Sequence, residues 1–171
     1  GQCTPPVIPS GIACTKVVAG LSFSAALLSN GEIRAWGDNT VGQCNVPQLP
    51  PGVHSVTVAT SWRQAIAIRS DGSAVAWGGN NAGQLNGPPL PPSMQYIDVD
   101  AGQDHCLALR SDGMVLAWGS STYGQCAVPP LPSGVTFVEI DAGGSHSIAR
   151  RSDGVVVAWG ANFANQCSVP S

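Results

Sequence analysis

Four acidic side chains stand at two equivalent positions along the chain, in a spacing that would suit a divalent cation. Asp98 and Asp100 lie two residues apart, and Glu139 and Asp141 repeat this pair 41 residues later. Alternate residues of a β-strand point to the same side, so each pair would share one face. Carboxylate oxygens are the ligands that Ca²⁺ prefers, which makes these four residues metal candidates. We nevertheless expect a solvated strand face, no bound metal and no other cofactor.

Six cysteines provide sulfur for nucleophilic, redox or metal chemistry, yet most of them follow one pattern. A single repeated position holds Cys3, Cys44, Leu85, Cys126 and Cys167. Because leucine replaces cysteine in one copy, this position favours a small buried apolar group. There is no Cys-x-x-Cys pair, which disfavours a zinc site. Cys14 lies outside the pattern, and we predict a disulfide from Cys14 to Cys3 or to Cys167.

Catalysis by a nucleophile would need a serine or cysteine, a base and an orienting acid that converge. The bases available are His54, which stands in a link between repeats, and His105 and His146, which share one repeated position. We expect a surface position for His54 and structural roles for the other two. The chain is therefore predicted not to be an enzyme.

Trp62 and its neighbour Arg63 are the residues that most resemble a contact site. Trp62 stands in a loop position that is polar in the third and fourth copies of the repeat described next. A large aromatic side chain beside arginine on a loop is typical of an interface contact. Other loop residues are aromatic, or both donate and accept hydrogen bonds, and complete the ligand-binding candidates: Phe23, Asp38, Asn39, Asn80, Asn81, Thr122, Tyr123, Asn162 and Phe163.

These residues are carried by an internal repeat of 41 residues. Trp-Gly pairs begin at Trp36, Trp77, Trp118 and Trp159, and the Asn-Gly or Asp-Gly pairs and the Gln-Cys pairs keep the same spacing. We divide the chain into repeats 1–41, 42–82, 83–123 and 124–164. Residues 165–171 begin a fifth copy in phase with residues 1–7. The whole of 1–171 is predicted to be a single domain.

Each repeat has the pattern of short antiparallel strands. Apolar Ile97, Val99 and Ala101 alternate with acidic residues, which is typical of a half-buried strand. Two β-prone runs then flank an Asp-Gly pair, which favours a hairpin because glycine accepts the positive φ of a tight turn. We also expect a short strand at each Gln-Cys-x-Val-Pro segment. Repeated sets of three to four strands predict an all-β fold, a β-propeller of four 41-residue blades.

The sequence of the third repeat resembles a known family. Residues 101–119 read Ala-Gly-Gln-Asp-His-Cys-Leu-Ala-Leu-Arg-Ser-Asp-Gly-Met-Val-Leu-Ala-Trp-Gly, and Tyr-Gly-Gln-Cys-Ala-Val-Pro follows at 123–129. This run is similar to the regulator-of-chromosome-condensation repeat, in the compact bacterial form of a secreted β-lactamase inhibitory propeller. The resemblance implies structural histidines, and aromatic contact residues on the loops before the His-x-Leu-Ala strand and after Trp-Gly. Phe23, Trp62, Tyr123 and Phe163 are the aromatic residues there.

Four blades leave the closure of the ring open, because a repeat unit cannot bury its apolar faces alone. The chain closes as a four-bladed ring, or two chains join head to tail in an eight-bladed homodimeric ring, or the sequence is part of a longer array. We favour the homodimer, because blades of this length suit rings of about seven.

Composition and charge exclude several classes of function. The net charge is −3 and lysine occurs once, at Lys16, so we expect no nucleic-acid partner. No apolar run approaches the ~18 residues of a membrane span, and we expect no membrane partner. Six cysteines beside one lysine favour an oxidising compartment, and hence a secreted or extracellular location.

The repeated scaffold with differing loops predicts a non-enzymatic recognition module. Our first hypothesis is that variable loops on one propeller face bind a protein partner, because unlike loops suit one asymmetric surface. The alternative is a lectin-like protein that binds a glycan at several sites, with loop amides and hydroxyls on the sugar and aromatic rings stacked on it. A third hypothesis is an excerpted or engineered array without a natural ligand.

Overall fold

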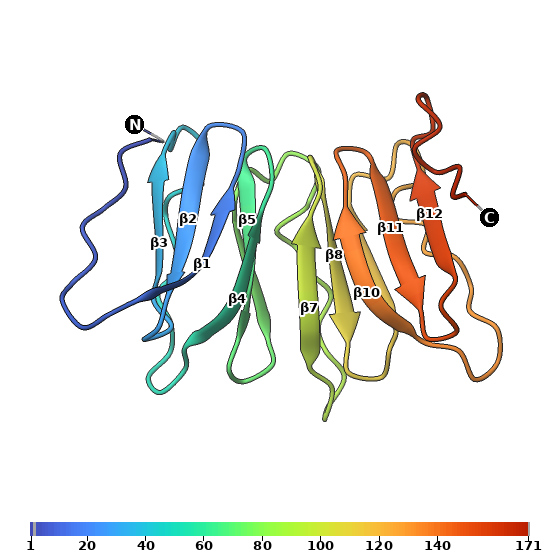
Figure 1. Ribbon diagram of the computed structural model, residues 1–171, viewed down its shortest axis with the longest axis horizontal. Coiled ribbons are helices and arrows are strands. Elements are labelled where there is room, and N and C mark those ends of the chain that lie inside the picture. The colour runs from blue at the N-terminus through green and yellow to red at the C-terminus, as the bar shows by residue number, and fades with distance from the viewer. Residues whose placement is uncertain (2, 171) are drawn as a thin grey trace.

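The computed structural model describes residue 1 and residues 3–170, which form twelve strands in four sheets (Figure 1). The strands are β1 Cys14–Ala19, β2 Phe23–Leu28, β3 Ile33–Gly37, β4 Ser55–Thr60, β5 Gln64–Arg69, β6 Ala74–Gly78, β7 Tyr96–Ala101, β8 His105–Arg110, β9 Val115–Gly119, β10 Phe137–Ala142, β11 His146–Arg151 and β12 Val156–Gly160. Each sheet is one blade of three antiparallel strands in chain order. Blade 1 is β1–β3, blade 2 is β4–β6, blade 3 is β7–β9 and blade 4 is β10–β12.

The blades stand side by side in an arc, with blade 1 at one end and blade 4 at the other (Figure 1). The first strand of each blade lies beside the first strand of the next, and we call β1, β4, β7 and β10 the inner strands. The predicted all-β propeller architecture of four blades is confirmed, and the arc is not a closed ring. Among the described residues, no helix is long and apolar enough to cross a membrane.

The second and third strands of every blade form the hairpin that the Asn-Gly and Asp-Gly pairs predict. At the turn of blade 2, Gly72 adopts a φ of 81°, which side chains rarely tolerate. A Cβ at Gly72 would also lie 2.4 Å from Cγ of Gln95. The Asp71 carboxylate closes the turn by accepting a bond of 2.9 Å from the Ser73 N–H. The short polar turn therefore fixes the register of the strands.

The two sides of an internal blade pack against the blade before it and the blade after it. On the side facing blade 3, Ile66 and Ile68 of blade 2 contact Val99, Cys106 and Ala108. Equivalent clusters join blade 1 to blade 2 and blade 3 to blade 4. Burial of these apolar side chains between sheets is the main stabilising contribution, at about 25 cal/mol for each Å² removed from water.

The repeated tryptophans fasten these interfaces with a hydrogen bond. The indole Nε1–H of Trp77 in blade 2 donates to the backbone carbonyl of Gln43, which follows blade 1, over 3.1 Å. Trp118 and Trp159 make the same bond, of 2.9 Å, to the carbonyls of Gln84 and Gln125. One side chain therefore fills the interface and satisfies a carbonyl of the preceding repeat.

The expected strand at each Gln-Cys-x-Val-Pro segment is wrong, because consecutive turns occupy it in the structure. In the first copy, the Asn45 N–H donates to the carbonyl of Gly42 and the Val46 N–H to that of Cys44. These local bonds use the N–H groups that a strand would offer to a neighbour, and Pro47 has no N–H. The buried Gln43 side chain holds the segment by accepting a 3.0 Å bond from the Val41 N–H.

The interface bond predicts the effect of substituting its tryptophan. Trp77→Phe keeps an aromatic ring but leaves the buried Gln43 carbonyl without its donor and opens a cavity. We expect the free energy of unfolding in urea to fall by about 2–4 kcal/mol. Trp62→Phe, at an exposed tryptophan, is the control and should stay within about 0.5 kcal/mol of the parent. Equal losses in the two variants would contradict the role of the bond.

Candidate functional site

Two sets of loops lie together at one edge of the blades, the upper edge in Figure 1. The loop before each middle strand accepts a backbone bond from the loop after the outer strand. In blade 2 the Gly79 N–H donates to the Arg63 carbonyl over 2.8 Å, and in blade 3 the Ser120 N–H donates to the Asp104 carbonyl over 2.7 Å. Blades 1 and 4 repeat this bond. We call this edge the loop face; it comprises residues 20–22, 38–42, 61–63, 79–83, 102–104, 120–124, 143–145 and 161–165.

The loop face carries most of the predicted contact residues. Trp62, Tyr123 and Phe163 are large apolar side chains exposed there, and Arg63 beside Trp62 is exposed too. The rings of Tyr123 and Phe163, from neighbouring blades, meet edge to face with centroids 5.2 Å apart. This arrangement is a favourable one for aromatic pairs and presents a rigid apolar feature to solvent.

Phe23 does not belong to this set. Its side chain is only 1% exposed and packs in the cluster between blades 1 and 2. Phe23 begins the middle strand, at the repeat position that holds the buried Gln64 and His105. The sequence interpretation chose the wrong residue of this loop, because Leu21 is the exposed one. The alternation of the strand that follows, which places Phe23, Ala25 and Leu27 on one side, was the available signal.

The asparagines and the aspartate proposed as ligand-binding residues mostly hold the loops together. Oδ1 of Asn39, Asn80 and Asn162 accepts the N–H of the residue five positions later, over 2.8–2.9 Å. Asp38 accepts bonds from the Thr40 N–H and hydroxyl and from the Gln43 amide. The Thr40 hydroxyl is the largest cause of the lowered pKa of Asp38. Asn81 and Thr122 remain exposed on the face.

A polar hollow of about 280 Å³ opens on the loop face between blades 3 and 4. Asp104, Ser120, Thr122, Tyr123 and Ser145 line it. The Ser120 and Thr122 hydroxyl oxygens lie 3.3 Å apart. This hollow places hydroxyl groups beside an aromatic ring, so a small polar group of a ligand can enter it next to Tyr123.

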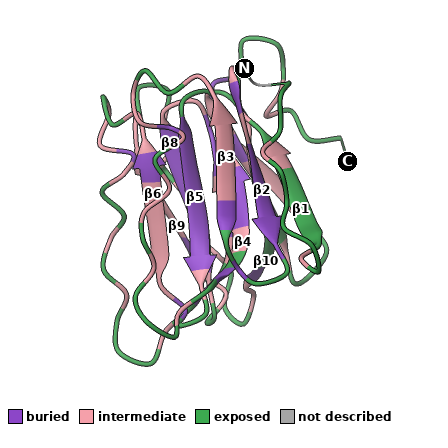
Figure 2. Cartoon of the chain, turned by 90° about the vertical axis from the view of Figure 1, so that its left-hand side faces the viewer, coloured by how far each residue is buried: buried purple, intermediate pink, exposed green. Residues whose placement is uncertain are grey.

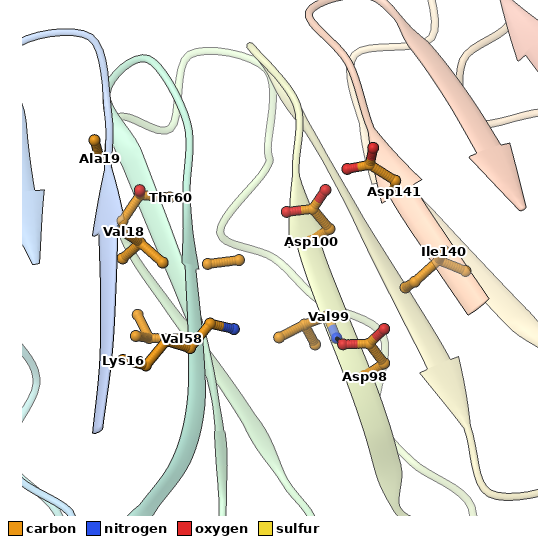
Figure 3. A pocket seen from close by; sticks show the side chains of 11 residues that line it. Lys16, Val18, Ala19, Val58, Thr60, Asp98, Val99, Asp100, Ile140 and Asp141 are labelled. Atoms are coloured by element: carbon orange, nitrogen blue, oxygen red, sulfur yellow. Dashed lines mark hydrogen bonds between the residues drawn. The ribbon is translucent and has the colours of Figure 1, made fainter. Parts of the chain in front are cut away.

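The four acidic candidates lie on the inner strands, away from the loop residues. Asp98, Asp100 and Asp141, with Lys16, line a hollow of about 320 Å³ along these strands (Figure 3). Glu139 instead pairs with Arg150 at 2.8 Å. Among the described residues, no three or more His, Cys, Asp or Glu side chains gather closely enough to hold a metal ion. The four acids therefore do not form the shared ligand set that their spacing suggested.

Asp100 is the most perturbed acid of this hollow. Its Oδ2 accepts a 2.7 Å bond from the Ala142 N–H of the next blade. Burial, followed by the neighbouring Asp141 carboxyl, raises the pKa of Asp100 to about 7. Figure 3 shows the two carboxyl groups on neighbouring inner strands, β7 and β10. Asp100 therefore holds a proton in the folded chain at mildly acidic pH.

Most of the cysteines and His105 make structural contacts, whereas Cys3 and His54 are exposed. All six cysteines are free thiols, so neither predicted disulfide of Cys14 is present. Thiols at the repeated position donate to loop carbonyls, as Cys44 does to Asp38 over 3.2 Å. His105 is fully buried, with Nε2 3.0 Å from the Ser147 hydroxyl, and burial lowers its pKa to about 4. This His–Ser pair has no access to a substrate.

The raised pKa of Asp100 predicts a dependence of stability on pH. The folded chain binds this proton more tightly than the unfolded chain. Protonation of Asp100 therefore contributes fully to the free energy of unfolding below about pH 4, and this contribution is lost as pH rises through about 7. The stability of the parent minus that of Asp100→Asn, from urea unfolding, should fall by up to about 1.4 kcal/mol per pH unit in this window. This difference isolates the contribution of Asp100. The stability contributed by His105 changes with pH in the opposite direction, but it is present in both proteins and cancels.

Asp112→Asn is the control for this titration. Its hydrogen bond to the Arg110 guanidinium lowers the pKa of Asp112, so its contribution is already complete above about pH 4. The corresponding difference should be flat between pH 5 and pH 8. A flat difference for Asp100→Asn as well would contradict the protonated state assigned to Asp100.

Comparison with solved structures places this architecture among known propellers. The chain superposes on Prp20p from Saccharomyces cerevisiae with a TM-score of 0.78 at 24% identity, over 94% of this chain and 46% of that one. It matches human WBSCR16 with 0.81 at 20% identity, over 98% and 56%. The receptor kinase CR4 ectodomain of Physcomitrella patens gives 0.76 at 20% identity, over 98% and 46%. These likenesses concern the fold, and the chain spans about half the length of the proteins it matches.

The sequence itself matches a family model in three places. Residues 14–43, 96–125 and 137–166 match the model described as "Regulator of chromosome condensation (RCC1) repeat". No curated protein sequence matches the chain significantly. The matched segments make up more than half of the 171 residues and coincide with blades 1, 3 and 4. The resemblance seen in the sequence is confirmed: the chain belongs to the RCC1 repeat family.

Proposed function

We propose that the chain is a non-enzymatic scaffold that binds a protein partner through its loop face. The observation that carries this proposal is the exposure of Leu21, Trp62, Tyr123 and Phe163 on this one edge. Exposed aromatic side chains on a rigid scaffold are typical anchors of protein interfaces. Trp62 and the adjacent Arg63 combine the two side-chain types most enriched among such anchors.

The loop face is asymmetric, which favours one protein surface over repeated identical ligands. At the repeat position of Trp62, the other blades hold Leu21, Gln103 and Gly144. Phe163 and Tyr123 come from two further positions that hold no aromatic residue in the other repeats. A constant backbone with unlike side chains recognises an irregular surface, whereas a multivalent sugar binder would repeat its site.

Proteins of similar fold are described with protein partners. Prp20p is described by its binding to Gsp1p and histones, and yeast RCC1 (Prp20) by a structure in which it is bound to Kap60. Those partners belong to those proteins. For this chain they support the general use of an RCC1-like propeller as a platform for protein contacts.

A lectin-like function is the second candidate, and the hollow beside Tyr123 favours it. A sugar ring stacked on Tyr123 would place its hydroxyls against Ser120 and Thr122. The asparagine side chains weigh against it, because their Oδ1 atoms are already bonded within the loops. The protein-binding function therefore has the stronger support.

The test is affinity capture of protein partners from an extract of the source organism, paired with a glycan array. The chain should retain a protein that Trp62→Ala and Phe163→Ala retain at least about tenfold less. Met114→Ala is the matched control, because Met114 is 46% exposed against 47% for Trp62 but lies in the β8–β9 turn at the opposite edge. Its capture should equal that of the parent.

Two outcomes would contradict the proposed function. Capture that is identical for the parent and both loop-face variants would show that the partner binds elsewhere. Saturable binding to a glycan that Tyr123→Ala abolishes, with no protein captured, would make the chain a lectin.

A further inference from the structure

The outer side of blade 1 has the pattern of a blade interface, and no blade of the described residues packs on it. At one inner-strand position, Val58, Val99 and Ile140 are buried against the preceding blade. Val17 holds this position in blade 1 and is 71% exposed. Figure 2, which looks onto blade 1, shows β1 exposed beside the buried β2. We call this surface, formed by the outer side of β1 with Val17, the blade 1 end face; the neighbouring Lys16 points along the inner strands to Thr57.

The outer side of blade 4 is the matching surface at the other end of the arc. A hollow of about 240 Å³ lies there, with Ile148 and Val156 among its apolar walls. Arg150, at the repeat position of the buried Ile68 and Leu109, is exposed and paired with Glu139. We call this surface, with Glu139, Asp141, Ile148, Arg150 and Val156, the blade 4 end face.

Opposite charges meet if blade 1 of a second copy packs on blade 4. The Lys16 ammonium donates to the Thr57 hydroxyl over 2.8 Å, so side chains at this position reach each other across a blade interface. Glu139 holds the same position in blade 4. A second copy placed as the next blade therefore brings its Lys16 beside Glu139, which favours the pairing electrostatically.

A hydrogen bond between blades 3 and 4 also has a counterpart at the new interface. Asp100 accepts the Ala142 N–H across that interface, and Asp141 and Ala19 stand at the corresponding positions of blades 4 and 1. Asp141 can therefore accept the Ala19 N–H of the second copy. Blades 1 and 2 hold Val18 and Ala59 at this position, which cannot accept a hydrogen bond. Only blades 3 and 4 can therefore bond to the blade that follows them in this way.

We propose that two copies of this chain join head to tail into an eight-bladed ring, with each blade 4 end face on the blade 1 end face of the other copy. The two interfaces are equal by twofold symmetry and leave no end face exposed. Prp20p and CR4, of which this chain spans 46%, are about the length of two copies. The dimer presents the loop face twice, whichever ligand that face binds.

The two ends of the chain compete for one place at each new interface, because residues 1–7 and 165–171 share the same repeat phase. The described part of the second segment is bonded to blade 4 as in the other blades: Asn162 Oδ1 accepts the Cys167 N–H, and Gln166 Oε1 accepts the Ala164 N–H, both over 2.8 Å. The described part of the first segment is bonded too, because the Thr4 N–H donates to the Gly1 carbonyl over 3.1 Å and the Arg34 guanidinium donates to the Val7 carbonyl. Ring closure therefore requires one of the two segments to move.

Sedimentation velocity on the full chain tests the ring, with a mass twice the 17.4 kDa of one chain expected. Val17→Asp should give a monomer, because it places a charge in the new interface. Val56→Asp is the control, since Val56 is exposed at the bulge of β4 and outside the blade interfaces, and it should remain a dimer. Both sites are exposed in the single chain, so circular dichroism should show both variants folded.

A charge exchange distinguishes this interface from any other. Lys16→Glu alone sets two glutamates against each other, and Glu139→Lys alone sets two lysines together, so each variant should dimerise at least about tenfold more weakly. Mixed in equal amounts, the two variants place opposite charges at both interfaces of each ring and should form a heterodimer that is tighter than either variant alone. A monomeric parent, an open series of larger polymers, a dimer of Val17→Asp, or a mixture no tighter than its components would each overturn the ring.

Discussion

Packing of one blade on the next is the interaction on which the rest of the structure depends. A three-stranded sheet of this size has two apolar sides and cannot bury either alone. The interface combines apolar clusters with an indole that donates to a carbonyl of the preceding repeat, as Trp77 does to Gln43. Because these groups recur every 41 residues, the three internal interfaces are nearly the same.

This division of labour separates stability from recognition. The interface residues stabilise the stack of blades, and the loops are held by hydrogen bonds within each loop, such as the one from the Cys44 N–H to Asn39. The side chains that point outward from those loops are therefore free to differ, and the exposed Trp62 and Phe163 differ from their repeat counterparts. The same logic applies at the ends of the arc, where Val17 and Arg150 hold interface positions that meet solvent.

Much of the fold follows from the sequence, because the repeated residues are those that determine turns and strands. The Asp-Gly pairs and the alternation around Val99 predict the hairpins and strands correctly. The sequence misled us at Phe23, where aromatic character suggested contact and strand alternation buries the ring. It also misled us at Gln43, whose segment looks β-prone but is held in turns by its own side chain. The meeting of Tyr123 with Phe163, and of Asp100 with Asp141, depends on blade spacing, which one sequence does not supply.

Hydrogen exchange of the tryptophan indoles, followed by NMR on ¹⁵N-labelled chain, tests the central role of the blade interface most directly. The Nε1–H groups of Trp77, Trp118 and Trp159 are bonded within the interfaces and should exchange slowly, with similar rates. The indole of exposed Trp62 should exchange within the dead time and serves as the internal reference. Interface indoles that exchange as fast as Trp62 would contradict the account.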